Sequence, residues 1–131
     1  MKSDEQIMAE LARAADGLWY MSESDYPLEP VRLEGTDEPG PELLRAAAGA
    51  DKGAAVETRE LEEFFRDRAA VRMTRNGSGE SASFAGVVGA LRRNLADLRV
   101  YRIGEINISV YVLGRSGSGS WLGLSTRIVE T

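Results

Sequence analysis

The sequence contains no cysteine and no histidine among its 131 residues. Without cysteine, the chain has no disulfide, no thiolate nucleophile and no cysteine-based zinc or iron–sulfur site. Without histidine, it lacks the side chain that serves most often as a general base and as a metal ligand. Catalysis by carboxylates alone, as in glycosidases, stays an alternative. The two absences together favour a protein that does not catalyse a reaction.

Long hydrophobic runs are also missing. The first residues, Met1 to Gln6, hold no cationic segment that leads into an apolar stretch. We therefore expect no signal peptide, no membrane span and a cytoplasmic location. Hydrophobic residues make up 43% and charged residues 28% of the chain, which is typical of a soluble globular protein. A length of 131 residues fits one domain, residues 1–131.

The charge balance limits the kind of partner. The chain has a formal net charge of −5. Direct binding of nucleic acid is not expected, because phosphate backbones are held by clustered lysine and arginine. A basic protein surface suits this acidic chain better.

Apolar residues at three- and four-residue spacing predict helices. The first begins after Ser3 or Asp4 and ends near Gly17. Shorter helical segments are expected over 42–48 and from Thr58 onward. The best defined helix covers about 83–96, and its apolar stripe comprises Phe84, Val87, Val88, Leu91, Leu95 and Leu98.

Alternating apolar and polar residues predict strands at 31–34, 54–57, 100–103, 106–112 and 121–130. The last three follow one another through short turns, so we expect an antiparallel meander. The tract 71–81 has no such pattern and is expected to be a loop. Because the meander needs helices to cover its apolar face, the pattern indicates an α+β fold.

A glycine- and serine-rich segment, Gly114 to Ser120, resembles a phosphate-binding loop only superficially. It lacks the Gly-Lys-Ser/Thr ending and precedes a strand rather than a helix. We interpret it as a hairpin turn.

The candidate functional residues lie in an acidic stretch, Met21 to Pro27, and at the end of the sequence. Glu23 and Asp25 could act as an acid/base pair, bind a hard cation or be solvated, and the residues alone favour solvation. Two carboxylates are too few for such a cation, which takes six or more ligands. Thr131 would add a terminal carboxylate and a hydroxyl. The strand pattern continues to Val129, which argues against a frayed end.

Several blocks of sequence closely resemble the nuclease A inhibitor-like family. They are Ala15–Leu18 with Met21–Pro27, Val100–Glu105 with Val110–Val112, and Gly123–Thr131. The blocks occur in the family's order, and the resemblance spans nearly the whole chain.

This resemblance implies a three-layer α/β/α sandwich around a central, largely antiparallel sheet. It also implies that the chain inhibits a sugar-non-specific DNA/RNA endonuclease that uses Mg²⁺ or a similar divalent ion. In the family the C-terminal threonine reaches the nuclease's metal, supported by an acid of the loop; by position these are Thr131 and Glu23. The inhibitor would hold no cofactor of its own and would be a monomer when free. The expected partner-binding residues are Glu23, Thr131, Ser22, Ser24, Asp25 and Arg75.

One segment departs from the family pattern. Where the family has an acidic segment with an interface tryptophan, this chain has Val71–Glu80, with basic residues and no aromatic one. A buried tryptophan can contribute ~2 kcal/mol or more to binding. This departure leaves open the alternative of a binding module of the same fold with a non-nuclease partner. A hydrolase that uses Glu23 and Asp25 is a separate alternative.

Overall fold

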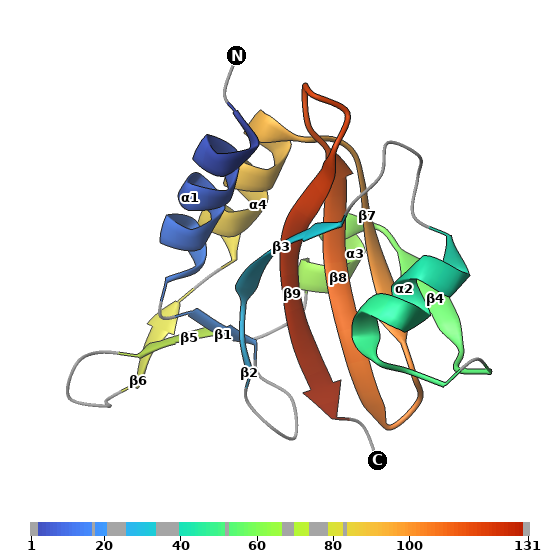
Figure 1. The fold of residues 1–131 in the computed structure, drawn as a ribbon. Helices are drawn as coiled ribbons and strands as arrows, with labels where there is room; N and C mark the ends of the chain where they lie inside the picture. The colour runs from blue at the N-terminus through green and yellow to red at the C-terminus, as the bar shows by residue number, and fades with distance from the viewer. Residues whose placement is uncertain are drawn as a thin grey trace.

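A computed structural model provides the structure of the protein and describes residues 3–16, 18–20, 26–33, 40–51, 53–66, 70–73, 79–82 and 84–129. Of these, residues 18–20, 26–27, 66, 70–73 and 79–82 are described by their backbone alone. The described residues form an α+β fold with four helices and a five-stranded antiparallel sheet (Figure 1). None of the described helices is both long and apolar enough to cross a bilayer.

The five-stranded sheet contains the predicted meander. Its strand order is β3 (Glu29–Leu33), β9 (Trp121–Val129), β8 (Asn107–Arg115), β7 (Ala96–Ile103) and β4 (Val56–Arg59). All neighbours are antiparallel, with β3 and β4 at the two edges. The β8 and β9 backbones approach closely at Gly123, where an added Cβ would lie 1.8 Å from the Val112 carbonyl oxygen. Glycine is therefore required at this position.

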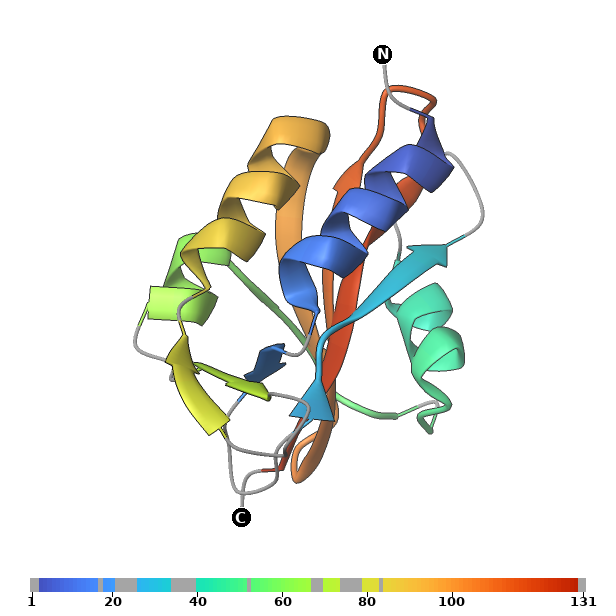
Figure 2. The same ribbon diagram turned by 90° about the vertical axis from the view of Figure 1, so that its left-hand side faces the viewer.

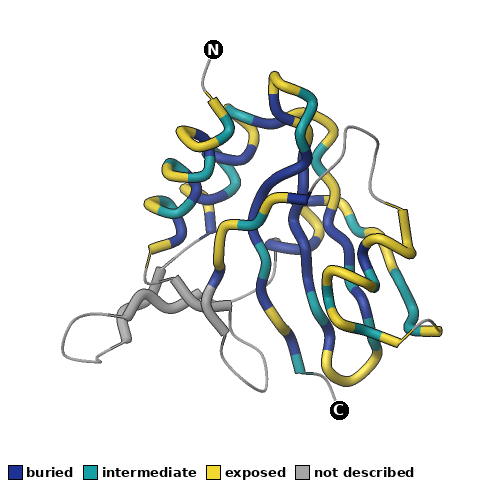
Figure 3. Tube along the Cα trace, viewed as in Figure 1, coloured by how far each residue is buried: buried dark blue, intermediate teal, exposed yellow. Residues whose placement is uncertain are grey.

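One face of the sheet, which we call the inner face, carries the main core. Its side chains are Val100, Ile108, Val110, Val112, Leu122, Leu124 and Ile128. Buried residues run along the central strands β8 and β9 (Figure 3). Three helices supply the other side of this core: α1 (Asp4–Ala15), α3 (Leu61–Arg66) and α4 (Ala85–Asn94). Helices α1 and α4 pack against each other over this face (Figure 2).

The first helix begins where the sequence predicts. Ser3 Oγ accepts a hydrogen bond from the Gln6 N–H at 3.2 Å, and Gln6 Oε1 accepts one from the Ser3 N–H at 2.8 Å. This capping box satisfies two backbone donors that a helix start leaves free. The predicted inward residues Ile7, Leu11 and Ala15 are buried.

The opposite face, the outer face, is covered by α2 (Pro41–Ala48). Leu44 is 1% exposed and packs into a second cluster with Leu33, Tyr101, Ile103, Tyr111, Leu113 and Trp121. Pro41 occupies the start of the helix, where its missing N–H is not needed, and Gly49 ends it in the left-handed conformation at φ 67°. The helix predicted over 42–48 is thus confirmed.

The second sheet is the main difference from the sequence prediction. It pairs β2 (Tyr26–Pro27), β1 (Leu18–Tyr20), β5 (Ala70–Met73) and β6 (Gly79–Ala82), in that order. The tract predicted as a loop over 71–81 therefore contains two strands. They are stabilised by pairing with each other and with β1, which no local pattern of residues reveals.

Several predicted boundaries were also wrong. The fourth helix ends at Asn94 rather than Ala96, because Leu95 is extended and Ala96 already pairs with Arg115. Helix α3 begins at Leu61 rather than at Thr58, because Thr58 belongs to β4 and pairs with Tyr101. The second meander strand begins at Asn107, one residue after Ile106, which is 58% exposed.

Candidate functional site

The residues predicted to bind a partner are Glu23, Thr131, Ser22, Ser24, Asp25 and Arg75, and all six lie outside the described residues. The structure does define the strands that lead into them. The candidate site is therefore located through the ends of β1, β2 and β9.

Strands β1 and β2 hold the two ends of the acidic stretch together. They form an antiparallel pair in which Tyr20 lies opposite Tyr26 and Trp19 opposite Pro27. Five residues, 21–25, connect the paired positions. A connection of this length is ordinary for a hairpin, and Glu23 is its central residue.

Strand β9 brings the end of the chain to the same region. It contacts both β1 and β2 and ends at Val129, which pairs with Asn107 of β8. The arrowhead of β9 and strand β2 lie toward the same end of the molecule in both ribbon views (Figures 1 and 2). Two segments separated by almost the whole sequence thus meet there.

Covalent geometry limits how far the two predicted residues can be from these strands. An extended chain spans at most ~3.6 Å per residue. The Cα of Thr131 is therefore within ~7 Å of the Cα of Val129, and that of Glu23 is within ~11 Å of the Cα of Tyr20.

Arg75 is carried by a different part of the second sheet. Strand β5 ends at Met73 before it in the sequence, and strand β6 begins at Gly79 after it. Met73 and Gly79 pair with each other. In the β1–β5 pair, Tyr20 lies opposite Ala70 and Leu18 opposite Arg72. The strand ends that lead to residue 75 are therefore at the opposite end of this pair from those that lead to Glu23.

A turn between β8 and β9 is present as predicted, but it covers only residues 116–120, because Gly114 and Arg115 belong to β8. The Ser116 N–H donates to the Ser120 carbonyl at 2.8 Å, which closes the turn. Ser116 Oγ and Ser118 Oγ each donate to Asp4 Oδ1 at 2.8 Å. These hydroxyls bind a carboxylate of α1, and the turn holds the start of that helix against the sheet.

Acidic side chains do not cluster into a metal site among the described residues. This part of the chain contains no group of three or more acidic side chains placed to hold a metal ion. Two carboxylates described in full lie on elements that flank the last part of β9. Glu29 of β3 is exposed and pairs with Ser125, and Glu105 is exposed in the turn before Asn107, which pairs with Val129.

Comparison with known protein families identifies the family to which these segments are similar. The model of a family described as nuclease A inhibitor-like protein matches residues 5–131. The match includes both the acidic stretch and the end of the sequence. No curated protein matches the chain.

Proposed function

The chain belongs to the nuclease A inhibitor-like family, and on that premise we propose that it blocks the active site of a sugar-non-specific, metal-dependent endonuclease. Membership of this family implies a nuclease inhibitor role. The target and the contacts belong to the proposal. We assign the central contact to Thr131, whose carboxylate and hydroxyl approach the nuclease's divalent ion, and a supporting contact to Glu23.

The observation that supports this assignment is the meeting of β2 and β9. Both carry the predicted residues within a few positions of their ends, and the two strands contact each other. One surface can therefore present a loop carboxylate and a chain terminus to one partner. Such a surface suits a nuclease cleft, which is shaped to receive a phosphate group.

The chemistry of the proposed contact follows from the ligands that hard cations prefer. Mg²⁺ binds oxygen ligands, and it is usually held by one or two carboxylates together with substrate phosphates and water. A carboxylate with a neighbouring hydroxyl can take the place of phosphate oxygens. The ion is assigned to the nuclease, because two residues of the inhibitor supply fewer ligands than the ion requires.

The proposal requires a free carboxylate at Thr131, which provides its test. The unmodified protein is compared with a variant extended by several residues after Thr131 and with one that carries the same residues before Met1. Inhibition of a purified magnesium-dependent, sugar-non-specific endonuclease is the readout. We expect the C-terminal extension to weaken inhibition by about a hundredfold or more, as for loss of a central interface contact.

The N-terminal extension serves as the matched control and should leave inhibition unchanged. Glu23→Gln, which removes charge but keeps shape, should weaken inhibition less than the C-terminal extension does. Equal inhibition by the two extended proteins would refute the contact between Thr131 and the metal. A wild-type protein that inhibits none of a panel of such nucleases would favour the alternative of a different protein partner.

A further inference from the structure

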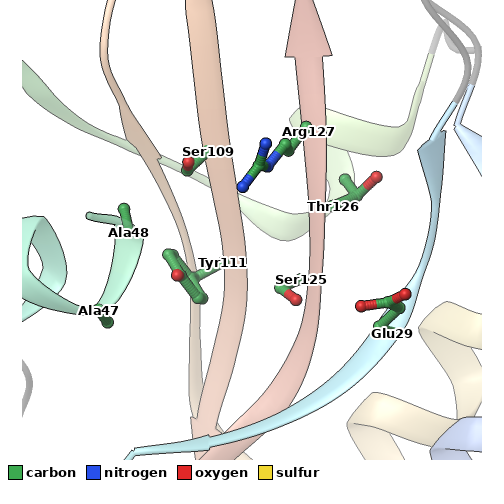
Figure 4. A pocket seen from close by; sticks show the side chains of 8 residues that line it. All are labelled: Glu29, Ala47, Ala48, Ser109, Tyr111, Ser125, Thr126 and Arg127. Atoms are coloured by element: carbon green, nitrogen blue, oxygen red, sulfur yellow. The ribbon is translucent and has the colours of Figure 1, made fainter. Parts of the chain in front are cut away.

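A polar groove crosses the outer face of the five-stranded sheet next to α2. Its cavity has a volume of about 330 Å³. Figure 4 shows Glu29 of β3 on one side, Ser125 and Arg127 of β9 in the middle, and Ser109 and Tyr111 of β8 on the other. Ala47 and Ala48, at the end of α2, complete that far side. We call this the outer groove.

The outer groove exists because the side chains on the outer face of β8 and β9 become smaller along the sheet, away from Leu44. Nearer the middle of the outer face, Leu113 and Trp121 pack under α2 around Leu44. Further along, the outward positions are Ser109 of β8 and Ser125 of β9. Together with Ala47 and Ala48, these short side chains leave the space between helix and sheet unfilled.

Among the described residues, the charged residues of the outer groove lack the ion pairs that several other charged residues of this sheet form. Arg59 and Arg102 contact Glu57 at 2.8 and 3.5 Å, and Arg115 contacts Asp97 at 2.9 Å. Within the described part of the chain, Arg127 and Glu29 form no ion pair and no side-chain hydrogen bond. Both are exposed. Their hydrogen-bonding capacity is available to a partner.

The hydroxyls of the groove can act as donors beside Arg127. Burial raises the pKa of Tyr111, and the charge of Arg127 only partly offsets this effect. The phenol therefore stays protonated at neutral pH. A carboxylate that entered the groove would meet one guanidinium and up to three hydroxyl donors, from Ser109, Tyr111 and Ser125.

The outer groove continues toward the candidate site. A second cavity of about 320 Å³ shares Ala48, Ser109 and Arg127 with it and reaches Val129 at the end of β9. Arg127 precedes Thr131 by four residues, so their Cα atoms are at most ~14 Å apart. One side of a standard protein interface covers ~800 Å², a disc of ~16 Å radius. A partner centred on Thr131 therefore reaches Arg127.

We propose that the outer groove is a second contact surface for the nuclease, in which Arg127 pairs with an aspartate or glutamate side chain of that enzyme. This inference rests on the proposed function. The groove is open and lined by exposed charges, which suits a protruding side chain. The same alignment brings Glu29 opposite a donor of the nuclease, such as a lysine or a backbone N–H.

The test measures inhibition constants for Arg127→Glu, Arg127→Ala and Arg127→Lys against a purified endonuclease that the wild-type protein inhibits. We expect Arg127→Glu to weaken inhibition by about a hundredfold and Arg127→Ala by about tenfold. Arg127→Lys should lie between Arg127→Ala and the wild type, because it keeps the charge but loses the planar fork. The exposed position of Arg127 makes all three variants compatible with folding, which thermal denaturation checks.

Arg99→Glu is the matched control, since it makes the same charge change on the same sheet. Arg99 is exposed and lies opposite Leu113, away from the outer groove. The inhibition constant of the Arg99→Glu variant should lie within about twofold of the wild-type value. If Arg127→Glu and Arg99→Glu inhibit equally well while the wild type inhibits strongly, the groove contact is refuted and the proposed function stands.

Direct binding separates the two proposals further. A protein extended after Thr131 should lose inhibition but keep weak binding to the nuclease through the groove. Adding Arg127→Glu to that variant should abolish the remaining binding. Residual binding that is insensitive to Arg127→Glu would overturn the inference. Wild-type protein that neither binds nor inhibits would overturn both proposals, and self-association lost in Arg127→Glu would assign the groove to a second copy of the chain.

Discussion

The Asp4 carboxylate connects the first turn of α1 to the turn between β8 and β9. Its own burial raises its pKa, but hydrogen bonds from Ser116, Ser118 and Ser120 and the charge of Arg32 outweigh that effect, so the pKa lies below its usual value. A carboxyl with a lowered pKa in the folded state stabilises that state at every pH above the pKa of the unfolded chain. The stabilisation is lost as pH falls through the folded-state pKa.

Asp4→Asn tests this contribution. We expect it to lower the free energy of unfolding at pH 7 by about 1 kcal/mol, because it replaces charge-assisted hydrogen bonds that solvent partly screens. The difference from the wild type should shrink as pH falls below ~3.9, the usual pKa of aspartate in unfolded chains. Urea denaturation at neutral and acidic pH measures the loss of stability and its dependence on pH. The exposed Asp51 offers the control Asp51→Asn, and a difference independent of pH would contradict the role of the Asp4 charge.

At the scale of elements, α2 is the helix that forms one wall of the outer groove. Leu44 is its one buried side chain. The adjacent Leu43 is 41% exposed. Ala48 also packs against the outer cluster, and Arg45 Nε donates to the Ala54 carbonyl at 2.8 Å. Leu44 is nevertheless the main apolar contact of this helix, so the width of the outer groove depends strongly on it.

Leu44→Ala should lower the free energy of unfolding by about 2–4 kcal/mol, since it leaves a cavity over the outer face of the sheet. Leu43→Ala removes the same atoms from an exposed site and should change stability by less than ~1 kcal/mol. Chemical denaturation of both variants provides the comparison. Amide hydrogen exchange should rise in α2 of Leu44→Ala before it rises in β8. Similar stabilities for the two variants would contradict this account of α2.

The elements also differ in how far the sequence predicts them. The meander and α1 were predicted because their signals are local: alternation in β8 and β9, and a cap followed by an apolar stripe in α1. Strands β1, β2, β5 and β6 are two to four residues long, and β1 pairs with β5 some fifty residues away. Segments that short become strands through their partners, so no pattern within them predicts the second sheet.

The same distinction applies to the candidate sites. Glu23 and Thr131 are identified by the family resemblance, and the meeting of β2 and β9 needs the tertiary structure. Alternation already places Ser125 and Arg127 on the face opposite Leu124. That this face is left open beyond Ala48 depends on where α2 packs, which the sequence does not specify.

For the whole molecule, the net charge of −5 bears on how a complex forms. An acidic inhibitor is drawn toward the basic cleft of a nuclease, and such attraction acts mainly on the association rate. Salt screens it, because the Debye length falls from ~14 Å to ~4 Å as ionic strength rises from about 0.05 to about 0.5 M.

We therefore expect the association rate constant with the nuclease to fall about tenfold or more over that range, and the dissociation rate constant to change by less than about threefold. Surface plasmon resonance or stopped-flow fluorescence measures both constants. Association that is independent of salt would show that charge attraction does not guide this complex.

The position of β9 between β3 and β8 has a consequence for how the chain folds. Strand β3 is synthesised well before β9, which is its only partner in the five-stranded sheet. The paired residues of the two strands are roughly a hundred positions apart in sequence. Loops of that size close slowly, and contacts between distant residues slow folding more than they weaken the final state. Edge strand β3 is therefore expected to join last, after β7, β8 and β9 have formed their meander. Until then the apolar residues of this strand stay without cover, which makes the half-folded chain the form most prone to aggregate.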